Sequence, residues 1–236
     1  MADRVDLMSD DFGAQPWLYP GTRPPTSGLL HDGSYSRLDA LPSVAERYVV
    51  VAVGSNASPA VMYRKLATNG VSGTVPFVYA EVTGLRVGHS AHVSRAGYIA
   101  AAPILTPSAR TSVVAVFLDH EQLTAVDRTE PNYVRESVGR DECRLSVEGG
   151  DSPASFQLYV SKRGVLAPPG ERPLGLMDQD ALYAGLRQRC EQFSRLLPAG
   201  DRAAMRRFAA DEHLRDQAVD AFHRGGWVAQ GRFAAT

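Results

Sequence analysis

The chain has 236 residues, of which 44% are hydrophobic and 22% charged, a composition typical of a globular protein with its own core. Its 25 lysines and arginines nearly balance 26 aspartates and glutamates, so no basic excess favours nucleic acid or an anionic membrane as a partner. No apolar run is long enough to cross a bilayer, and the start of the chain does not resemble a signal peptide. We therefore expect a soluble, cytoplasmic protein.

The first 45 residues differ from the rest, because five of the 15 prolines lie there and no helical or alternating apolar pattern survives. Trp17, Leu18 and Tyr19 are nevertheless too apolar for a solvated tail. They predict an extended arm that packs on the folded body, with a disordered leader as the alternative. We thus predict an arm over residues 1–45 and a domain over residues 46–236, with a helical extension at its C-terminal end.

The domain opens with the apolar run Tyr48–Val53, which predicts a buried strand ended by Gly54. Ser58 and Pro59 then predict the N-cap and the first residue of a helix through about Ala67. The spacing of Glu121–Thr129 predicts a second helix. Further strands are predicted at Val75–Thr83, Tyr98–Ala102, Val113–Leu118, Tyr133–Val138, Arg144–Val147 and Phe156–Val160.

The pattern becomes wholly helical after Pro173. Asp178 is the predicted cap of a helix through Leu197, and Asp201 that of a helix through Phe222, before Gly225 and Gly226. Short strands followed by helices indicate an α+β fold with a small, mixed or mostly antiparallel barrel or sheet.

The loop Gly54-Ser55-Asn56 is the first candidate for chemistry. A strand, a glycine turn and a helix start bring several backbone N–H groups together, which suits a carboxylate, a phosphate or a developing oxyanion. Taken alone, the loop is better explained as an ordinary turn between a strand and a helix.

Glu130 is the second candidate, because Pro131 ends the preceding helix and places this carboxylate just before a strand. A partly buried carboxylate there suits proton transfer near neutral pH. Taken alone, Glu130 is better explained as a surface acid paired with Arg128 or Arg135.

Other reactive residue types suggest no further site. His89 and His92 are spaced as metal ligands only if they lie in a helix, and we expect them to face solvent or form hydrogen bonds in a strand or loop. Cys143 and Cys190 are too few for a disulfide framework or a four-cysteine zinc site, and we expect both to be packing residues. We therefore predict no metal and no cofactor. The chain has only two lysines, a bias that we attribute to a GC-rich bacterial genome.

Taken in order, these segments resemble the γ-glutamylcyclotransferase-like family over residues 48–197. That family has a buried strand ending in Tyr-Gly-Ser-Asn, which corresponds here to Val53–Asn56. Its Asp-x-x-Glu before an aromatic-bearing strand corresponds to Asp127–Glu130 followed by Tyr133. A later strand leading into prolines corresponds to Phe156–Tyr159 and Ala167–Pro169.

The resemblance implies a small β-barrel with flanking helices and an enzyme that cyclises a γ-glutamyl amine or amide to 5-oxoproline. It makes Glu130 the general acid/base and makes Val53, Gly54, Ser55, Asn56 and Tyr133 the substrate-binding residues. The implied partner is a small γ-glutamyl molecule, and neither metal nor cofactor takes part.

Two departures from the family pattern are Val53, where the family has tyrosine, and Pro131, where it commonly has glycine. They favour, as an alternative, a non-catalytic or repurposed member that binds a small carboxylate or a peptide end.

Overall fold

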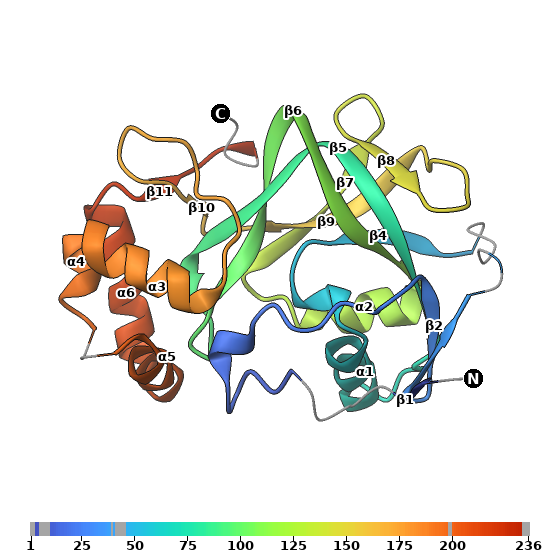
Figure 1. Cartoon of the computed structure of the whole chain (residues 1–236), viewed down its shortest axis with the longest axis horizontal. Coiled ribbons are helices and arrows are strands. Elements are labelled where there is room, and N and C mark those ends of the chain that lie inside the picture. Colours follow the sequence, from blue (N-terminus) through green and yellow to red (C-terminus); the bar gives the residue numbers. More distant parts are fainter. Residues whose placement is uncertain (1–2, 5–9, 39, 41–45, 198–199, 233–236) are drawn as a thin grey trace. The chain divides into compact units, whose positions relative to one another are not determined.

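The computed structural model describes residues 3–4, 10–38, 40, 46–197 and 200–232. It divides into two compact units, and Figure 1 labels most of their helices and strands. The first unit comprises Met1–Asp10, Gly21–Arg86 and Thr106–Val160, and the second comprises Asp11–Pro20, Val87–Leu105 and Ser161–Thr236. Residues of the predicted arm thus contribute to both units, while the proposed boundary after residue 45 stays a prediction.

The strands of the first unit form a mixed sheet in the order β1-β3-β2-β5-β6-β4-β9-β7, with β8 paired to β5. Strands β4 and β9 are parallel, whereas β4 and β6 are antiparallel. Their bounds are Asp3–Arg4 (β1), Gly28–His31 (β2), Ser34–Arg37 (β3), Tyr48–Ala52 (β4), Val75–Val93 (β5), Ile99–Leu118 (β6), Tyr133–Gly139 (β7), Arg144–Val147 (β8) and Ser155–Ser161 (β9). This strand order does not close on itself within the described residues, so the α+β class is established and the barrel stays a prediction.

Two long strands correct the predicted strand list. The segments predicted at Tyr98–Ala102 and Val113–Leu118 belong, except for Tyr98, to one strand, β6, because the chain stays extended through Pro103 and Pro107. Strand β5 continues ten residues beyond Thr83 to Val93. Gly84 has a φ of +97° and interrupts the alternation of side chains along β5. A glycine at this position looks like the end of a strand when only the sequence is considered.

The two helices of the first unit begin where the sequence predicts caps. Helix α1 spans Pro59–Thr68, and the Ser58 side chain accepts a hydrogen bond from the Val61 N–H. Helix α2 spans His120–Arg128 and starts with a capping box formed by Asp119 and Gln122. The helices pack beside each other (Figure 1). Their apolar faces join a core that also contains strand residues such as Val50, Phe77 and Val116.

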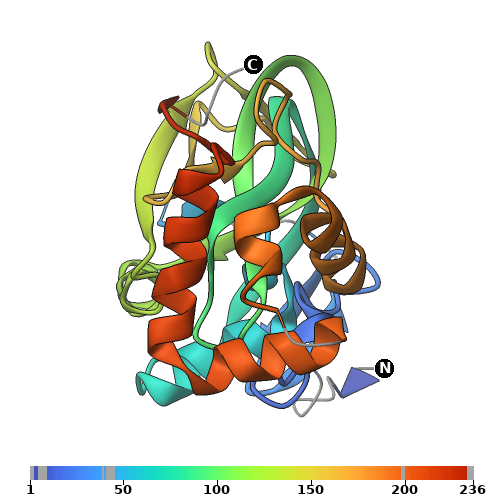
Figure 2. The same ribbon diagram turned by 90° about the vertical axis from the view of Figure 1, so that its left-hand side faces the viewer.

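The second unit carries the C-terminal helices, which face the viewer in Figure 2. Its elements are η1 Pro16–Leu18, β10 Val165–Leu166, α3 Gln179–Arg189, α4 Glu191–Ser194, α5 Asp201–Ala210, α6 Glu212–Arg224 and β11 Val228–Ala229, together with the end of β5 and the start of β6. No helix among the residues that the structure describes is long and apolar enough to cross a membrane.

The helix boundaries of the second unit differ from the prediction at three points. The helix capped by Asp178 ends at Arg189, and Cys190 separates it from α4. Asp201 is the first residue of α5, whose N-cap is Gly200. The helix predicted through Phe222 is broken at Asp211, because its side chain accepts the Leu214 N–H and so starts α6.

The sequence predicts that residues 17–19 of the arm pack on the folded protein. Tyr19 is buried and its hydroxyl accepts the Ala101 N–H at 2.8 Å. Trp17 packs against the core of the second unit, with the guanidinium groups of Arg202 and Arg206 each 4.9 Å from its ring centre. The expectation is confirmed for these two residues and wrong for Leu18, which is 44% exposed.

His89 and His92 lie in strand β5 and are buried, so the expectation of hydrogen-bonded strand residues is confirmed and that of solvent-facing residues is wrong. The Nε2 atom of His89 accepts the Met177 N–H at 3.1 Å, and His92 Nδ1 lies 2.6 Å from Ser90 Oγ. Burial lowers the pKa of each histidine to about 4, and for His92 the charge of Arg163 acts in the same direction.

This burial predicts a loss of stability in mild acid. The unfolded chain has histidine pKa values near 6.5, so between pH 6.5 and pH 4 it binds more protons than the folded protein. We expect the free energy of unfolding to fall as the pH drops through this range, by about 1.4 kcal/mol per pH unit for each histidine. Urea unfolding at pH 7, 6 and 5 measures the slope. Equal stability at pH 7 and pH 5 would contradict this prediction. The control is His213→Gln at an exposed histidine, which should leave the dependence of stability on pH unchanged.

Candidate active site

Glu130 occupies the turn between α2 and β7, at the helix–strand boundary that the sequence predicts. Its N–H donates to the Asp127 carbonyl at 3.1 Å, and its own carbonyl accepts the Tyr133 N–H at 3.0 Å. The backbone of the turn is therefore hydrogen-bonded on both sides of the carboxylate. The side chain is 15% exposed, so it is partly buried but still accessible to solvent.

The Gly54–Asn56 loop lies against this carboxylate, although the two are far apart in the sequence. The loop leaves β4 and forms the short turn η2, Ser55–Ala57. The Asn56 side chain donates from Nδ2 to Glu130 Oε1 at 3.0 Å, a contact between residues 74 positions apart. Within the described part of the chain, the backbone N–H groups of Ser55 and Asn56 have no acceptor. The fold thus brings together the two main candidates from the sequence.

Lys65 completes the cluster, and the sequence interpretation did not identify it. Its Nζ atom lies 2.6 Å from Glu130 Oε1 and 2.8 Å from Asn56 Oδ1. Two signals could have found it. Lys65 is one of only two lysines, and it stands two helical turns after the Ser58 cap. Because helix side chains point back towards the N-terminus, a long side chain there reaches towards the loop that precedes α1.

The arginine partners proposed for Glu130 are not observed. Arg135 instead binds Asp127, with 2.9 Å between Nε and Oδ1. The Tyr159 hydroxyl donates to the same Asp127 oxygen at 2.8 Å. The hydrogen bond to Asp127 raises the pKa of Arg135, and burial together with that hydrogen bond raises the pKa of Tyr159. Asp127 therefore holds β7 and β9 to the end of α2, and the partner of Glu130 is Lys65.

The remaining two predicted site residues lie close in the sequence to the loop and to the turn that carries Glu130. Val53 follows β4 and is buried. Tyr133 begins β7 and packs against the core of the first unit. Their contact with a substrate stays a prediction.

An early segment of the first unit supports the start of α1. The Asp10 carboxylate accepts hydrogen bonds from the Ser58 hydroxyl at 2.6 Å and from the Thr22 N–H at 2.9 Å. Arg64 of the same helix donates to the Asp10 carbonyl at 2.6 Å. Because Ser58 is the N-cap of α1, Asp10 fixes the N-terminal end of the helix that carries Lys65.

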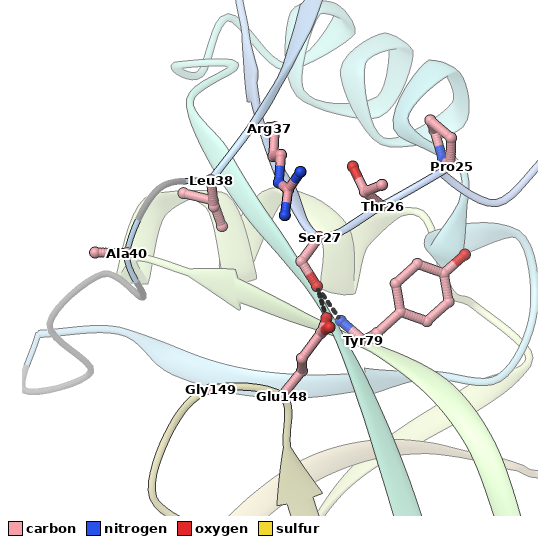
Figure 3. Close-up of a pocket in the computed structure, with 9 residues that line it drawn as sticks. All are labelled: Pro25, Thr26, Ser27, Arg37, Leu38, Ala40, Tyr79, Glu148 and Gly149. Atoms are coloured by element: carbon pink, nitrogen blue, oxygen red, sulfur yellow. Dashed lines mark hydrogen bonds between the residues drawn. The ribbon is translucent and has the colours of Figure 1, made fainter.

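A separate cavity of about 380 Å³ lies elsewhere on the first unit and is shown in Figure 3. Its wall includes Arg37 and Glu148, and the Ser27 hydroxyl donates to the Glu148 carboxylate at 2.5 Å and accepts the Tyr79 N–H at 2.9 Å. None of the site residues predicted from the sequence lines this cavity. We place the candidate chemistry at Glu130, where a loop, a helix and a turn converge on one carboxylate.

Neither a family model nor a curated protein matches the chain. Solved structures do match it, among them one titled "Gamma-glutamyl cyclotransferase", with 12% identity, a TM-score of 0.41 and coverage of 74% of this chain and 99% of that one. An uncharacterized protein from Homo sapiens has 13% identity, a TM-score of 0.38 and coverage of 73% and 98%. A protein from Arabidopsis thaliana has 16% identity, a TM-score of 0.38 and coverage of 52% of this chain and 66% of its own. The similar structures thus include a protein of the family that the sequence motifs predict.

Proposed function

We propose that the chain is a γ-glutamylcyclotransferase-like enzyme, an amine lyase or acyltransferase that converts a γ-glutamyl amine or amide to 5-oxoproline and a free amine. The observation that carries this proposal is the 3.0 Å hydrogen bond from Asn56 to Glu130. It puts the expected proton-transfer group beside the expected binding loop. The small barrel implied by the family resemblance belongs to the same proposal.

The reaction needs few protein groups, because the nucleophile is part of the substrate. The α-amine attacks the γ-carbonyl carbon, a new C–N bond closes the five-membered ring, and the original C–N bond to the departing amine breaks. Holding both ends on one molecule supplies a high effective concentration. Overall, two protons leave the α-nitrogen and two reach the departing nitrogen. A single carboxylate can carry them in turn.

We assign this proton transfer to Glu130 and substrate binding to the Gly54–Asn56 loop. Backbone N–H groups of Ser55 and Asn56 are available in the described residues to stabilise a carboxylate or the tetrahedral oxyanion. Val53 and Tyr133 contribute apolar surface beside the bound molecule.

The test is a screen of γ-glutamyl amino acids, γ-glutamyl peptides and γ-glutamyl amines for release of 5-oxoproline by the full-length protein. We expect at least one to yield 5-oxoproline and free amine in equal amounts, without added metal or cofactor. Formation of glutamate in place of 5-oxoproline would indicate hydrolysis by water and would contradict the cyclisation.

A second candidate function is binding of a small carboxylate or peptide end without catalysis. The ion pair between Lys65 and Glu130, at 2.6 Å, favours this alternative, because it occupies one oxygen of the carboxylate that the reaction uses. A ligand that binds in the same screen but forms no 5-oxoproline would support it. A cytoplasmic location, a bacterial source and the exclusion of nucleic acid and membrane partners stay predictions.

A further inference from the structure

In the Lys65–Glu130 pair, each of the two side chains keeps one hydrogen-bonding position unused. An ammonium group has three N–H donors, and Lys65 directs two of them to Glu130 Oε1 and Asn56 Oδ1. Glu130 Oε1 accepts from both Lys65 and Asn56. Across the described residues, the third Lys65 donor has no acceptor and Glu130 Oε2 has no donor. An unused cationic donor and an unused anionic acceptor therefore lie on adjacent groups.

Both groups are partly buried yet accessible to solvent. The Lys65 side chain is 17% exposed and the Glu130 side chain is 15% exposed. Partial burial strengthens charged hydrogen bonds relative to bulk water, while the remaining exposure leaves room for approach from outside. The open positions are thus suited to recognition of a polar molecule.

The charge balance of the pair selects the kind of molecule. A lone anion would satisfy Lys65 but would place a second negative charge beside Glu130. A lone cation would satisfy Glu130 but would place a second positive charge beside Lys65. Uncompensated charge at a partly buried position costs free energy. A zwitterion that carries both charges on one carbon satisfies both groups and keeps the site neutral. The head group of an α-amino acid has this arrangement.

We infer that Lys65 is a specificity-determining residue that binds the α-carboxylate of the ligand, while Glu130 accepts a hydrogen bond from its α-amine. The inference rests on the proposed function in placing a γ-glutamyl head group at this site. Lys65 supplies a full positive charge that the backbone N–H groups of the Gly54–Asn56 loop do not carry. The site would therefore require a free α-carboxylate on the glutamyl unit.

The experiment compares binding of two probes to the full-length protein by isothermal titration calorimetry. One probe is L-glutamate, and the other is L-isoglutamine, in which a neutral carboxamide replaces the α-carboxylate. Neither contains the γ-amide bond that the proposed reaction breaks, so binding is measured without turnover. We expect the wild type to bind L-glutamate at least about tenfold more tightly, as a charged hydrogen bond allows.

Variants at the two lysines then show which residue causes the preference for L-glutamate over L-isoglutamine. Lys65→Met should raise the Kd for L-glutamate to that for L-isoglutamine and leave the latter unchanged within about threefold. Lys65→Arg keeps the positive charge and should keep most of the preference. Lys162→Met, at the other lysine, which is exposed, should behave as the wild type. Thermal unfolding of each variant establishes that it is folded, and the comparison of probes on the wild type needs no variant.

The outcomes separate this inference from the proposed reaction. A wild type that fails to bind L-glutamate or binds both probes equally overturns the inference, as does a folded Lys65→Met protein that keeps the preference. If the preference depends on Lys65 and no γ-glutamyl compound yields 5-oxoproline, the reaction is wrong and the inference stands. If 5-oxoproline forms but the carboxylate preference is absent, the reaction stands and the inference is wrong.

Discussion

Replacing Glu130 with glutamine is expected to lower the rate of 5-oxoproline formation by about a hundredfold or more, because the amide cannot relay protons. The fold should persist, since the glutamine oxygen still accepts hydrogen bonds from Lys65 and Asn56 in place of the carboxylate. We therefore expect the free energy of unfolding to change by only about 1 kcal/mol. Steady-state turnover of an active γ-glutamyl compound and urea unfolding measure the two effects.

The matched control is Glu121→Gln, the same chemical change at an exposed residue in the first turn of α2. It should leave both turnover and stability close to those of the wild type. Asp127 is a poor control, because it holds Arg135 and Tyr159 and its loss would affect stability. Wild-type turnover in a folded Glu130→Gln protein would refute the proposed role of this carboxylate.

Replacing Leu30 with alanine is expected to lower the free energy of unfolding by about 2–5 kcal/mol, because it leaves a cavity in a packed core. Leu30 lies in β2, is fully buried and belongs to the core of the first unit with Tyr35 and Phe77. Strand β2 is paired with β5, so the side chain cannot easily move to fill the space. Urea unfolding of the full-length protein measures the loss.

Leu18→Ala is the control within the same early segment, because Leu18 is 44% exposed and its removal should change stability by less than about 0.5 kcal/mol. Deleting all residues before Leu41 would remove Leu30 and Tyr35 together and should abolish cooperative folding of the first unit. Unchanged thermal stability after this deletion would mean that the segment is a dispensable leader.

The sequence by itself determined the elements that depend on local signals. The β-branched run before Gly54 specifies β4, and Ser58 followed by Pro59 specifies the start of α1, because a cap and a proline act on neighbouring backbone groups. Pro131 likewise sets the end of α2 and leaves Glu130 in a turn. Local patterns of this kind place Glu130 and the Gly54–Asn56 loop at element boundaries, and the order of the motifs, through the family resemblance, marks them as candidates for chemistry.

The tertiary structure alone decided which residues meet. Whether Glu130 pairs with Arg135 or with Lys65 depends on how α1 packs beside α2, and no local pattern encodes the distance between residues 65 positions apart. The length of β5 and β6 was also undecided, since glycine and proline resemble strand ends until neighbouring strands supply hydrogen bonds. Lys65 had no visible partner in the sequence, because ion pairs form through space once packing has brought opposite charges together. That is why the carboxylate was found from the sequence and the ammonium beside it only from the fold.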